Sequence, residues 1–444
     1  PAGSSAPETT RTGGEHNRFL SSKAMTYRQG MVSPHAFILG DPLPAERLSW
    51  LAGCLKYSYL VQYPEALRHS VQQESPIFIL FLTGDALYSL HDRELLNTWD
   101  IVLSLPGVWL VCDREELDIR GLSLRALKMK YPDQIFDQNG RSKSYPRSFW
   151  RELIRVFRKH APTAMSLGYL QVSSPYMNRS SECSVNCLHA AAEEHLSPEL
   201  YAFLDGVHAM HINQRPPVSM NIGEGLVELE TICKKKGLRF LLLADAASAA
   251  SRGYATWQGE GKKIVSGCTI HPAKIQELDA IARRMEEAHV VLGSSAASIA
   301  FPGDEDLASP AKQKERSPPP VVILASHTPY QEEYTLGGLS LATACARNDI
   351  PTRLVFIEDG VYSLVEPLDD QPEVTALSIH SLVQSVKAES NLELYAYKPS
   401  LTQRGIAKSR GLRGVLEIGT NELGKILLTR PGHVRANTQR VFIM

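Results

Sequence analysis

The chain has 444 residues, of which 43% are hydrophobic and 21% are charged, as is typical of globular domains with buried cores. Its 47 Lys and Arg residues nearly balance its 48 Asp and Glu residues, so the overall charge gives no reason to expect a nucleic acid or a membrane surface as a partner. The longest apolar run, residues 77–82, is far shorter than the roughly 20 residues of a membrane-spanning helix, so we expect no membrane span.

Residues 1–34 form a tail rich in Ser, Thr, Gly and Arg, in which Glu8 and Glu15 are the only acidic residues. This composition suits both the remnant of an organellar import segment and a disordered tail. We expect the protein in the mitochondrial matrix, with the cytoplasm as the alternative. The 7 cysteines are scattered without the spacing of a disulfide scaffold, which favours a reducing compartment.

A pattern of strand, acidic turn and Arg-Gly loop recurs three times after this tail. Each copy has a hydrophobic strand that runs into a turn with an aspartate: Asp85, Asp205 and Asp359. Downstream of each turn, a second strand leads to a loop that ends in Arg-Gly, with the glycine at Gly121, Gly253 and Gly405. In the second and third copies, Pro175 and Pro329 precede the aspartate by the same number of residues. The chain is therefore predicted to repeat one structural unit.

Between the strands, apolar residues recur at the three- and four-residue spacing of a helix that buries one face, as at Leu336, Leu339, Ala342 and Ala346. Alternating strands and helices predict an α/β fold built on mostly parallel sheets that helices flank. Residues 302–320 are charged and rich in Pro, as in a linker between folded units.

The motifs of the three copies resemble the DsrE/DsrF/DsrH sulfur-relay family, whose members are also called TusD, TusC and TusB. The third copy is similar to DsrF/TusC in residues 356–362 and 403–405, and the second is similar to DsrE/TusD in residues 173–176 and 204–208. The first copy is divergent and looks most like DsrH/TusB in residues 84–88.

This resemblance implies three tandem DsrE/F-like domains fused in one chain. The chain would then comprise an N-terminal tail (1–34), a divergent DsrH/TusB-like domain (35–160), a DsrE/TusD-like domain (163–300), a charged Pro-rich linker (301–319) and a DsrF/TusC-like domain (320–444). Proteins of the family assemble three homologous subunit types and pass persulfide sulfur from one cysteine to the next. The resemblance therefore implies a pseudo-trimer within one chain.

The relay cysteine of the family is missing from the position that the resemblance gives it, at the end of a strand. Asp245 occupies this position in the second copy, Tyr397 in the third and Asp113 in the first. A carboxylate cannot carry persulfide sulfur, because the transfer needs a thiolate. Cys112 lies one residue before Asp113, and in a strand its side chain would point to the opposite face. We expect Asp245 to have a hydrogen-bonding role and no catalytic one.

Other cysteines offer weaker candidates. Cys54 could match a cysteine near the first helix of DsrH-type subunits, or it could be a small buried helix residue. Cys183 and Cys187 lie one helical turn apart near His189, which is too few ligands for a zinc site. Cys268 lies near an expected helix start, where a thiol pKa can fall, although a plain loop cysteine fits as well. We expect no metal and no cofactor, since no phosphate-binding glycine loop is present.

Two basic segments could contact RNA phosphates or a partner protein, or could be solvated surfaces. In the first, a helix expected at residues 148–159 turns three arginines to one face: Arg151, Arg155 and Arg158. Its other face would pack on the sheet through Trp150, Leu153, Ile154 and Phe157. The second segment follows residue 398 and includes Lys408, Arg410, Arg413, Arg430 and Arg435.

The sequence favours a repurposed, non-catalytic DsrE/F-like protein that acts as a structural or assembly subunit of a larger complex, in which other protein subunits would be its partners. The alternative is a working sulfur-relay protein that uses Cys54 or Cys112 as the persulfide carrier. The replaced relay cysteine favours the structural role, and a persulfide on one specific cysteine would favour the enzyme.

Overall fold

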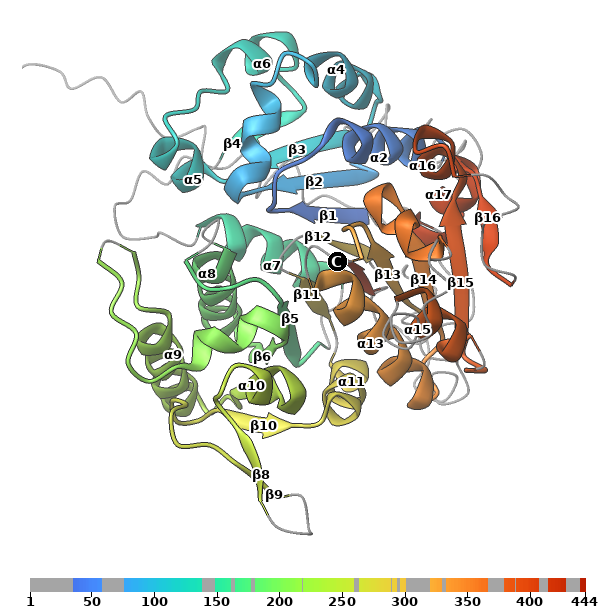
Figure 1. Ribbon diagram of the computed structural model, residues 1–444. Coiled ribbons are helices and arrows are strands. Elements are labelled where there is room, and N and C mark those ends of the chain that lie inside the picture. The colour runs from blue at the N-terminus through green and yellow to red at the C-terminus, as the bar shows by residue number, and fades with distance from the viewer. Residues whose placement is uncertain are drawn as a thin grey trace, which may run out of the picture.

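In a computed structural model, the chain folds into three five-stranded sheets flanked by helices, together with a small two-stranded hairpin (Figure 1). The sheets are mostly parallel, which confirms the predicted α/β class. The structure describes residues 35–57, 76–137, 148–160, 164–176, 180–217, 219–258, 263–288, 290–293, 296–300, 320–329, 333–365, 379–387, 389–406, 414–428 and 440–444.

The first sheet has the strand order β12-β1-β2-β3-β4. Its four parallel strands are β1 (His35–Leu39), β2 (Phe78–Leu82), β3 (Val108–Cys112) and β4 (Ile135–Asp137). β12 (Ala296–Ala300) pairs with β1 in the antiparallel direction. The accompanying helices are α2 (Ala45–Tyr57), η3 (Gly84–Leu90), α4 (Leu96–Ser104), α5 (Arg114–Ile119), α6 (Arg125–Lys130) and α7 (Ser148–His160).

The second sheet has the order β10-β7-β6-β5-β11, and its strands are all parallel. They are β5 (Ser166–Gln171), β6 (Ser197–Ala202), β7 (Leu241–Asp245), β10 (Lys274–Gln276) and β11 (Val291–Gly293). Its helices are α8 (Ser180–Glu193), η4 (Leu204–Met210), α9 (Ile222–Lys236), α10 (Ala246–Ser251) and α11 (Leu278–Glu287). The separate hairpin joins β8 (Thr256–Gln258) and β9 (Lys263–Val265).

The third sheet has the order β16-β15-β14-β13-β17, again with parallel strands only. They are β13 (Val321–Ala325), β14 (Thr352–Phe356), β15 (Leu392–Tyr397), β16 (Leu416–Ile418) and β17 (Arg440–Ile443). Its helices are α13 (Tyr334–Arg347), η6 (Glu358–Leu364), α15 (Ile379–Val386), α16 (Lys398–Gln403) and α17 (Thr420–Leu428).

The fifth strand is where the first sheet differs from the other two. In the second sheet, the fifth strand in chain order, β11, pairs with the first strand, β5. In the third sheet, β17 pairs with β13 in the same way. In the first sheet this place is taken by β12, at residues 296–300, which the sequence analysis assigned to the second copy. In residues 35–160, the element after β4 is the helix α7, so the described part of this stretch contains no fifth strand. β12 covers the edge of β1 that would otherwise stay open.

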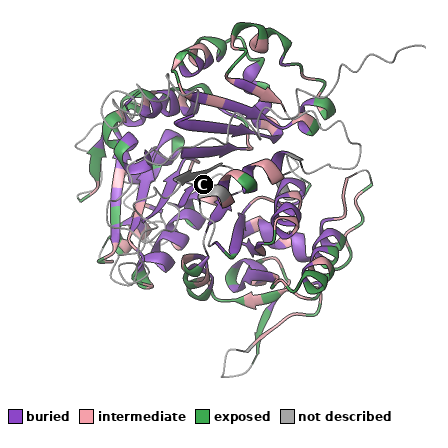
Figure 2. Cartoon of the chain, turned by 180° about the vertical axis from the view of Figure 1, so that it is seen from behind, coloured by how far each residue is buried: buried purple, intermediate pink, exposed green. Residues whose placement is uncertain are grey.

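Each hydrophobic core lies between two sheets. Side chains alternate between the two faces of a strand, so Phe37 and Leu39 of β1 join one core and Ala36 and Ile38 join another. The first core is shared by the first and third sheets, the second core by the first and second sheets, and the third core by the second and third sheets. β1, β5 and β13 are therefore buried on both faces (Figure 2).

Helix α7 takes part in this sharing. Its apolar face is buried as the sequence predicts, through Trp150, Leu153, Ile154 and Phe157. These side chains belong to the core that also contains Phe81 of the first sheet and residues of α8 and the second sheet. The helix thus joins two sheets, where the sequence predicts packing on one.

The fifth strands β11, β12 and β17 contact one another at the centre of the molecule (Figure 1). The three sheets are thereby arranged around one point, and helices of neighbouring sheets pack on one another, as α2 does on α17, α7 on α8 and α11 on α13. Within the described residues, no helix has the length and apolar character needed to cross a membrane.

Candidate functional site

The position expected for the relay cysteine lies at the end of the third strand of each sheet. β3, β7 and β15 each lead directly into a helix of 6 residues, namely α5, α10 and α16. The residue before each helix is its N-cap: Asp113, Asp245 and Tyr397. Ligands of open α/β sheets bind at this edge, outside the carboxyl ends of the strands.

Beside each of these ends lies the 3₁₀ turn that follows the second strand. The first residues of η3, η4 and η6 adopt a left-handed backbone, with φ of 55° at Gly84, 51° at Leu204 and 53° at Glu358. Such a φ is unfavourable for Leu and Glu. In both cases a hydroxyl accepts a hydrogen bond from the amide, Ser248 from Leu204 at 3.0 Å and Ser400 from Glu358 at 2.9 Å, which holds the turn against the following helix.

The aspartate and the arginine of the repeated motif form an ion pair in all three copies. The Arg252 Nε donates to Asp205 at 2.8 Å, and the Arg404 Nε donates to Asp359 at 2.8 Å. In the first copy, the Arg120 Nη2 donates to Asp85 at 2.8 Å. The sequence identifies both residues of each pair but gives no sign that they meet, because strand and helix separate them in the chain.

Asp245 is buried and held by hydrogen bonds at the start of α10. Both the backbone N–H and the hydroxyl of Ser248 donate to its Oδ2, at 2.7 Å and 2.6 Å. Burial raises the pKa of Asp245 above its ordinary range, and the two hydrogen bonds from Ser248 oppose that rise. Asp245 thus has the hydrogen-bonding role that the sequence predicts, and its carboxylate acts as the N-cap of α10.

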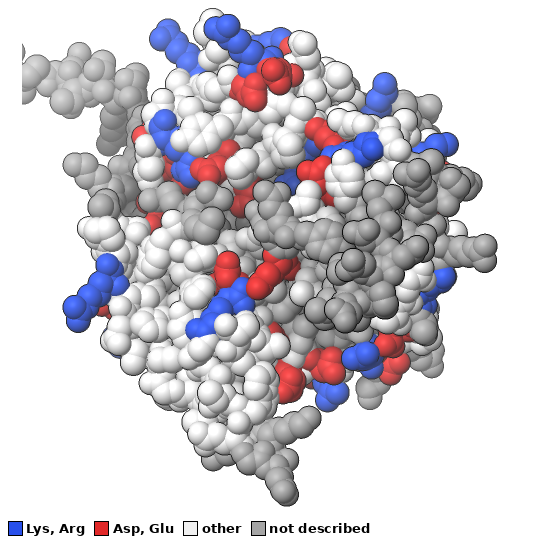
Figure 3. All heavy atoms as spheres, viewed as in Figure 1, with Lys and Arg blue, Asp and Glu red and all other residues white. Residues whose placement is uncertain are grey.

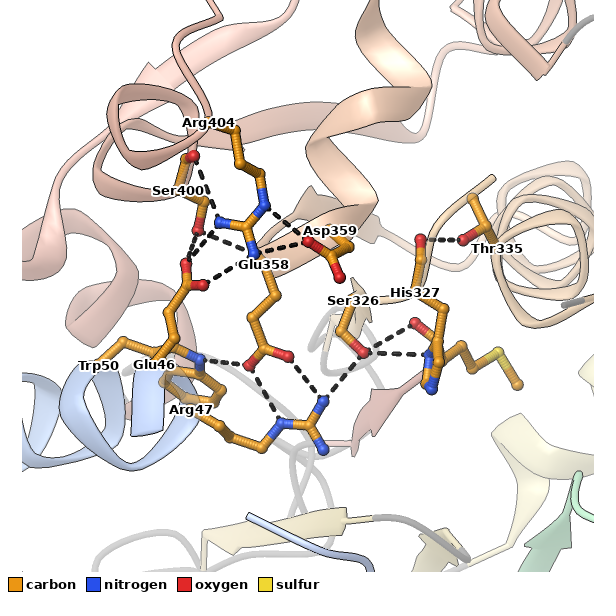
Figure 4. A network of polar contacts seen from close by, with 11 residues as sticks. Glu46, Arg47, Trp50, Ser326, His327, Thr335, Glu358, Asp359, Ser400 and Arg404 are labelled. Atoms are coloured by element: carbon orange, nitrogen blue, oxygen red, sulfur yellow. Dashed lines mark hydrogen bonds and ion pairs between the residues drawn. The ribbon is translucent and has the colours of Figure 1, made fainter. Parts of the chain in front are cut away.

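The third sheet meets α2 of the first sheet through a buried ion pair (Figure 4). The Nε and Nη2 of Arg47 donate to the two carboxylate oxygens of Glu358 at 3.1 Å and 2.8 Å, and both residues are buried, with exposed fractions of 7% and 6%. The indole N–H of Trp50 donates to the same carboxylate at 2.9 Å. The Nη2 of Arg47 also donates to the hydroxyl of Ser326 at 3.1 Å. Charge and hydrogen-bonding capacity are thus matched inside this contact.

A second group of contacts surrounds this ion pair. Glu46 accepts from the Arg404 Nη2 at 2.9 Å and from the Ser400 hydroxyl at 2.5 Å (Figure 4). Arg404 therefore bridges Asp359 of its own turn and Glu46 of α2. Glu358, Ser400 and Arg404 of the third unit thus all bind residues of α2.

The second and third sheets meet at the same backbone position with different chemistry. The side chain of Leu204 lies against Gly337 of α13, where an added Cβ would come within 2.6 Å of the Leu204 Cδ1. Arg252 repeats the bridging role of Arg404, since its Nη2 donates to Glu333 at 2.6 Å and it also pairs with Asp205. Here the contact is apolar at its centre and ionic at its rim.

The first and second sheets meet where Cys183 of α8 approaches the first strand end. Its Sγ lies 3.8 Å from the hydroxyl of Thr83, and this hydroxyl donates to Asp113 at 2.9 Å. Burial, together with the nearby Glu116 carboxylate, raises the pKa of Asp113 to about 7. Burial also raises the pKa of the Cys183 thiol, so the cysteine is a thiol rather than a thiolate at neutral pH.

The two cysteines of the sulfur-relay alternative lie in the core between the first and third sheets. Cys54 is on α2 and Cys112 ends β3, and both are fully buried. Burial raises the pKa of both thiols far above the ordinary range. A thiol without access or ionisation is a poor nucleophile, so neither residue has the surroundings of a persulfide carrier.

The remaining sulfur residues do not converge on a metal site. The His189 Nε2 is 3.1 Å from the Gly225 carbonyl, and burial raises the pKa of Cys187. Cys268 is half-buried, with its Sγ 3.9 Å from the Tyr254 carbonyl. In the part of the chain that the structure describes, no group of three or more His, Cys, Asp or Glu side chains is placed to hold a metal ion.

The arginines of α7 contact the end of α8. Arg151 and Arg155 pair with Glu194 at 3.1 Å and 3.2 Å, and Arg158 donates to the Glu194 carbonyl at 3.1 Å. The basic residues proposed for the second segment, Lys408, Arg410, Arg413, Arg430 and Arg435, lie outside the described residues. On the face drawn in Figure 3, basic and acidic side chains stand beside one another.

Comparison with family models finds one match, in the last part of the chain. The model of the DsrE/DsrF-like family matches residues 320–428, which run from β13 to α17. Among solved structures, the chain is similar to the crystal structure of the ychN protein from E. coli, with 20% identity, a TM-score of 0.24, and coverage of 28% of this chain and 99% of that one. No curated protein matches the chain. The mostly parallel sheets with flanking helices fit a DsrE-like fold.

Proposed function

We propose that this protein is a repurposed, non-catalytic DsrE/F-like protein that acts as a structural or assembly subunit of a larger complex of proteins. The observation that carries the proposal is Asp245. It stands where the resemblance places the relay cysteine, and Ser248 holds its carboxylate by two hydrogen bonds. The match of residues 320–428 connects the chain to a sulfur-relay-related family.

The proposal includes three tandem family-like units in one chain, near residues 35–160, 163–300 and 320–444. It is supported by the common strand order of the three sheets and by the recurring Asp–Arg ion pair. In each sheet, the third strand leads directly into a helix of 6 residues. A fold that repeats at this level of detail is consistent with fusion of homologous subunits.

Loss of transfer chemistry is supported at the three positions that precede these helices. The side chains there are two carboxylic acids and a phenol, none of which forms a persulfide. Their neighbours are occupied as well: Glu358 by Arg47 and Trp50, and Ser400 by Glu46. The polar groups that would be needed to bind and activate a sulfur donor serve contacts between the sheets.

A sulfur-loading experiment tests the proposal. The full chain is incubated with a cysteine desulfurase and sulfur-labelled cysteine, and each cysteine is then analysed for persulfide. We expect no label on the wild type, and none on the Asp245→Cys variant, because the surroundings of that position have changed too. A persulfide on Cys54 or Cys112 of the wild type, abolished by the corresponding Ser substitution, would establish the sulfur-relay alternative.

The structural role has its own test. The tagged full-length protein is purified from its native source under gentle conditions and its assembly size is measured. We expect it to elute with other proteins at fixed ratios through gel filtration and a second, orthogonal column. Elution of the chain by itself on both columns would contradict a role as a subunit.

A further inference from the structure

A pocket opens at the carboxyl edge of the first sheet, beside β3 and β4. It has a volume of about 380 Å³, and no contact described above uses it. Arg114 is the first residue of α5, Asp137 ends β4, and Arg125 and Lys128 reach the pocket from α6. This is the edge where open α/β sheets bind their ligands, and the size suits a small organic molecule.

The charge of the lining is positive. The lining contains three cationic side chains, Arg114, Arg125 and Lys128, and one carboxylate, Asp137. Its net charge is therefore two positive charges. Asp118 contacts Arg114 from outside the pocket, at 2.8 Å from its Nη2. Figure 3 shows basic side chains standing over α6 at the top of the drawn face. An anion is therefore the ligand that this lining favours.

Asp137 fixes the cations in place. Its side chain is 8% exposed, and it contacts both the Arg114 Nη1, at 3.1 Å, and the Lys128 ammonium. Arg has five N–H donors and Lys has three, so two cations that share one carboxylate still have donors available for a ligand. Burial lowers the pKa of Lys128, and the nearby charge of Arg114 lowers it further.

Arg125 is the group most available to a ligand. It is exposed, and among the residues that the structure describes no carboxylate pairs with its guanidinium. Its backbone N–H donates a hydrogen bond to the Ser123 hydroxyl at 3.3 Å, which orders the start of α6. Leu124 and Met129 add an apolar wall. A ligand with an anionic group and an uncharged, flat or apolar part would fit both surfaces.

We propose that this pocket binds a small organic phosphate monoester, such as a mononucleotide, with Arg125, Arg114 and Lys128 on the phosphate and Leu124 and Met129 against its organic part. A phosphate monoester carries about two negative charges at neutral pH, which matches the charge of the lining. Arginine is well suited to it, because the planar guanidinium can donate two parallel hydrogen bonds to phosphate oxygens. The inference does not depend on the sulfur chemistry of the chain.

Calorimetric titration of the full-length protein tests the site with four probes: AMP, adenosine, inorganic phosphate and a short uridine oligonucleotide. We expect AMP to bind, adenosine to show no binding, and inorganic phosphate to bind more weakly than AMP. Arg125→Gln should weaken AMP binding about tenfold or more, because it removes a charge-assisted hydrogen bond. Arg93→Gln, the same change at an exposed arginine outside the pocket, should leave the affinity within about twofold.

Three results would overturn the site. The first is failure of AMP to bind the wild-type protein. The second is an equal loss of affinity in Arg93→Gln and Arg125→Gln, which would mean attraction to the general surface. The third is binding of the oligonucleotide without binding of AMP, which would identify an RNA surface in place of a small-molecule pocket. Because Arg125 is exposed, its substitution is not expected to disturb folding, and the thermal unfolding of each variant checks this.

Discussion

The third and first sheets meet through a buried ion pair, whereas the second and third sheets meet at the same backbone position through an aliphatic side chain. Glu358 in one contact and Leu204 in the other share the same left-handed φ and the same hydrogen bond to a serine. Their partners differ accordingly, Arg47 with Trp50 in the first case and Gly337 in the second.

The different chemistry of the two contacts explains how three similar units can adopt a single arrangement. A buried carboxylate would be unpaired against Gly337, and a leucine would leave Arg47 without its partner, so each surface disfavours the wrong neighbour. The rims of the two contacts are alike, since Arg404 and Arg252 each bridge to an acidic residue of the adjacent unit. Specificity therefore resides in the centre of each contact.

The largest effect should come from breaking the buried ion pair. Arg47→Met leaves the buried Glu358 without its cationic partner, with only the hydrogen bond from Trp50, and we expect a loss of ~3–5 kcal/mol in the free energy of unfolding, measured by denaturant titration. Adding Glu358→Leu, the residue that the second sheet uses here, should restore most of the loss. The matched control is Arg252→Met, whose acidic partners Asp205 and Glu333 are 48% and 57% exposed, and which should cost ~1 kcal/mol or less. Equal losses for the two arginines would refute the distinction.

Titration of Asp113, at the contact between the first and second sheets, should make the free energy of unfolding depend on pH. The folded protein keeps the proton of Asp113 up to a pH of about 7, whereas the unfolded chain releases it near pH 4. Between these values the folded state binds more protons, so the free energy of unfolding should fall as pH rises, by a few kcal/mol. Asp113→Asn removes the titration, and stability curves of the two proteins that stay parallel from pH 4 to 7 would contradict the assignment.

The apolar contact should resist enlargement. Gly337→Val introduces side-chain atoms where Leu204 already lies, and we expect a loss of ~1–3 kcal/mol in stability. Leu204→Ala should relieve the clash. In a double-mutant cycle, the double variant should therefore lose less stability than the two single variants lose in sum. Simple additivity would show that the two residues do not press on each other.

The smallest effect should be that of the helix cap. Asp245→Ala removes the acceptor for both donors of Ser248, and we expect a loss of ~1 kcal/mol. Asp245→Asn should recover much of it, because asparagine is also a good N-cap. A change well above this magnitude, or a gain in stability at neutral pH, would mean that the carboxylate does something other than cap α10.

Much of the local structure follows from the sequence. The spacing of Trp150, Leu153, Ile154 and Phe157 predicts the buried face of α7, and the continuous apolar strands predict mostly parallel sheets. The position of Asp245 at a strand end is also predictable, because a strand pattern and the following Arg-Gly loop enclose it. These features depend on residues close together in the chain.

Contacts between distant segments were not predictable in the same way. Arg47 and Glu358 are separated by 311 positions, and neither lies in a pattern that points to the other. The antiparallel β12 was assigned to the second copy, because nothing in residues 296–300 shows which sheet edge they will cover. Strand pairing of this kind is decided by which edge remains open after the rest has folded.

The sequence by itself determined the α/β class, the threefold motif and the absence of a cysteine from the three positions where the resemblance places the relay cysteine, since each depends on short stretches of chain. Only the tertiary structure decided that the three cores are shared between neighbouring sheets, that each motif closes with an Asp–Arg ion pair, and that the three contacts differ in chemistry. The physical reason is that burial and charge pairing depend on which surfaces meet, and side chains that alternate along a strand do not say which sheet will cover each face.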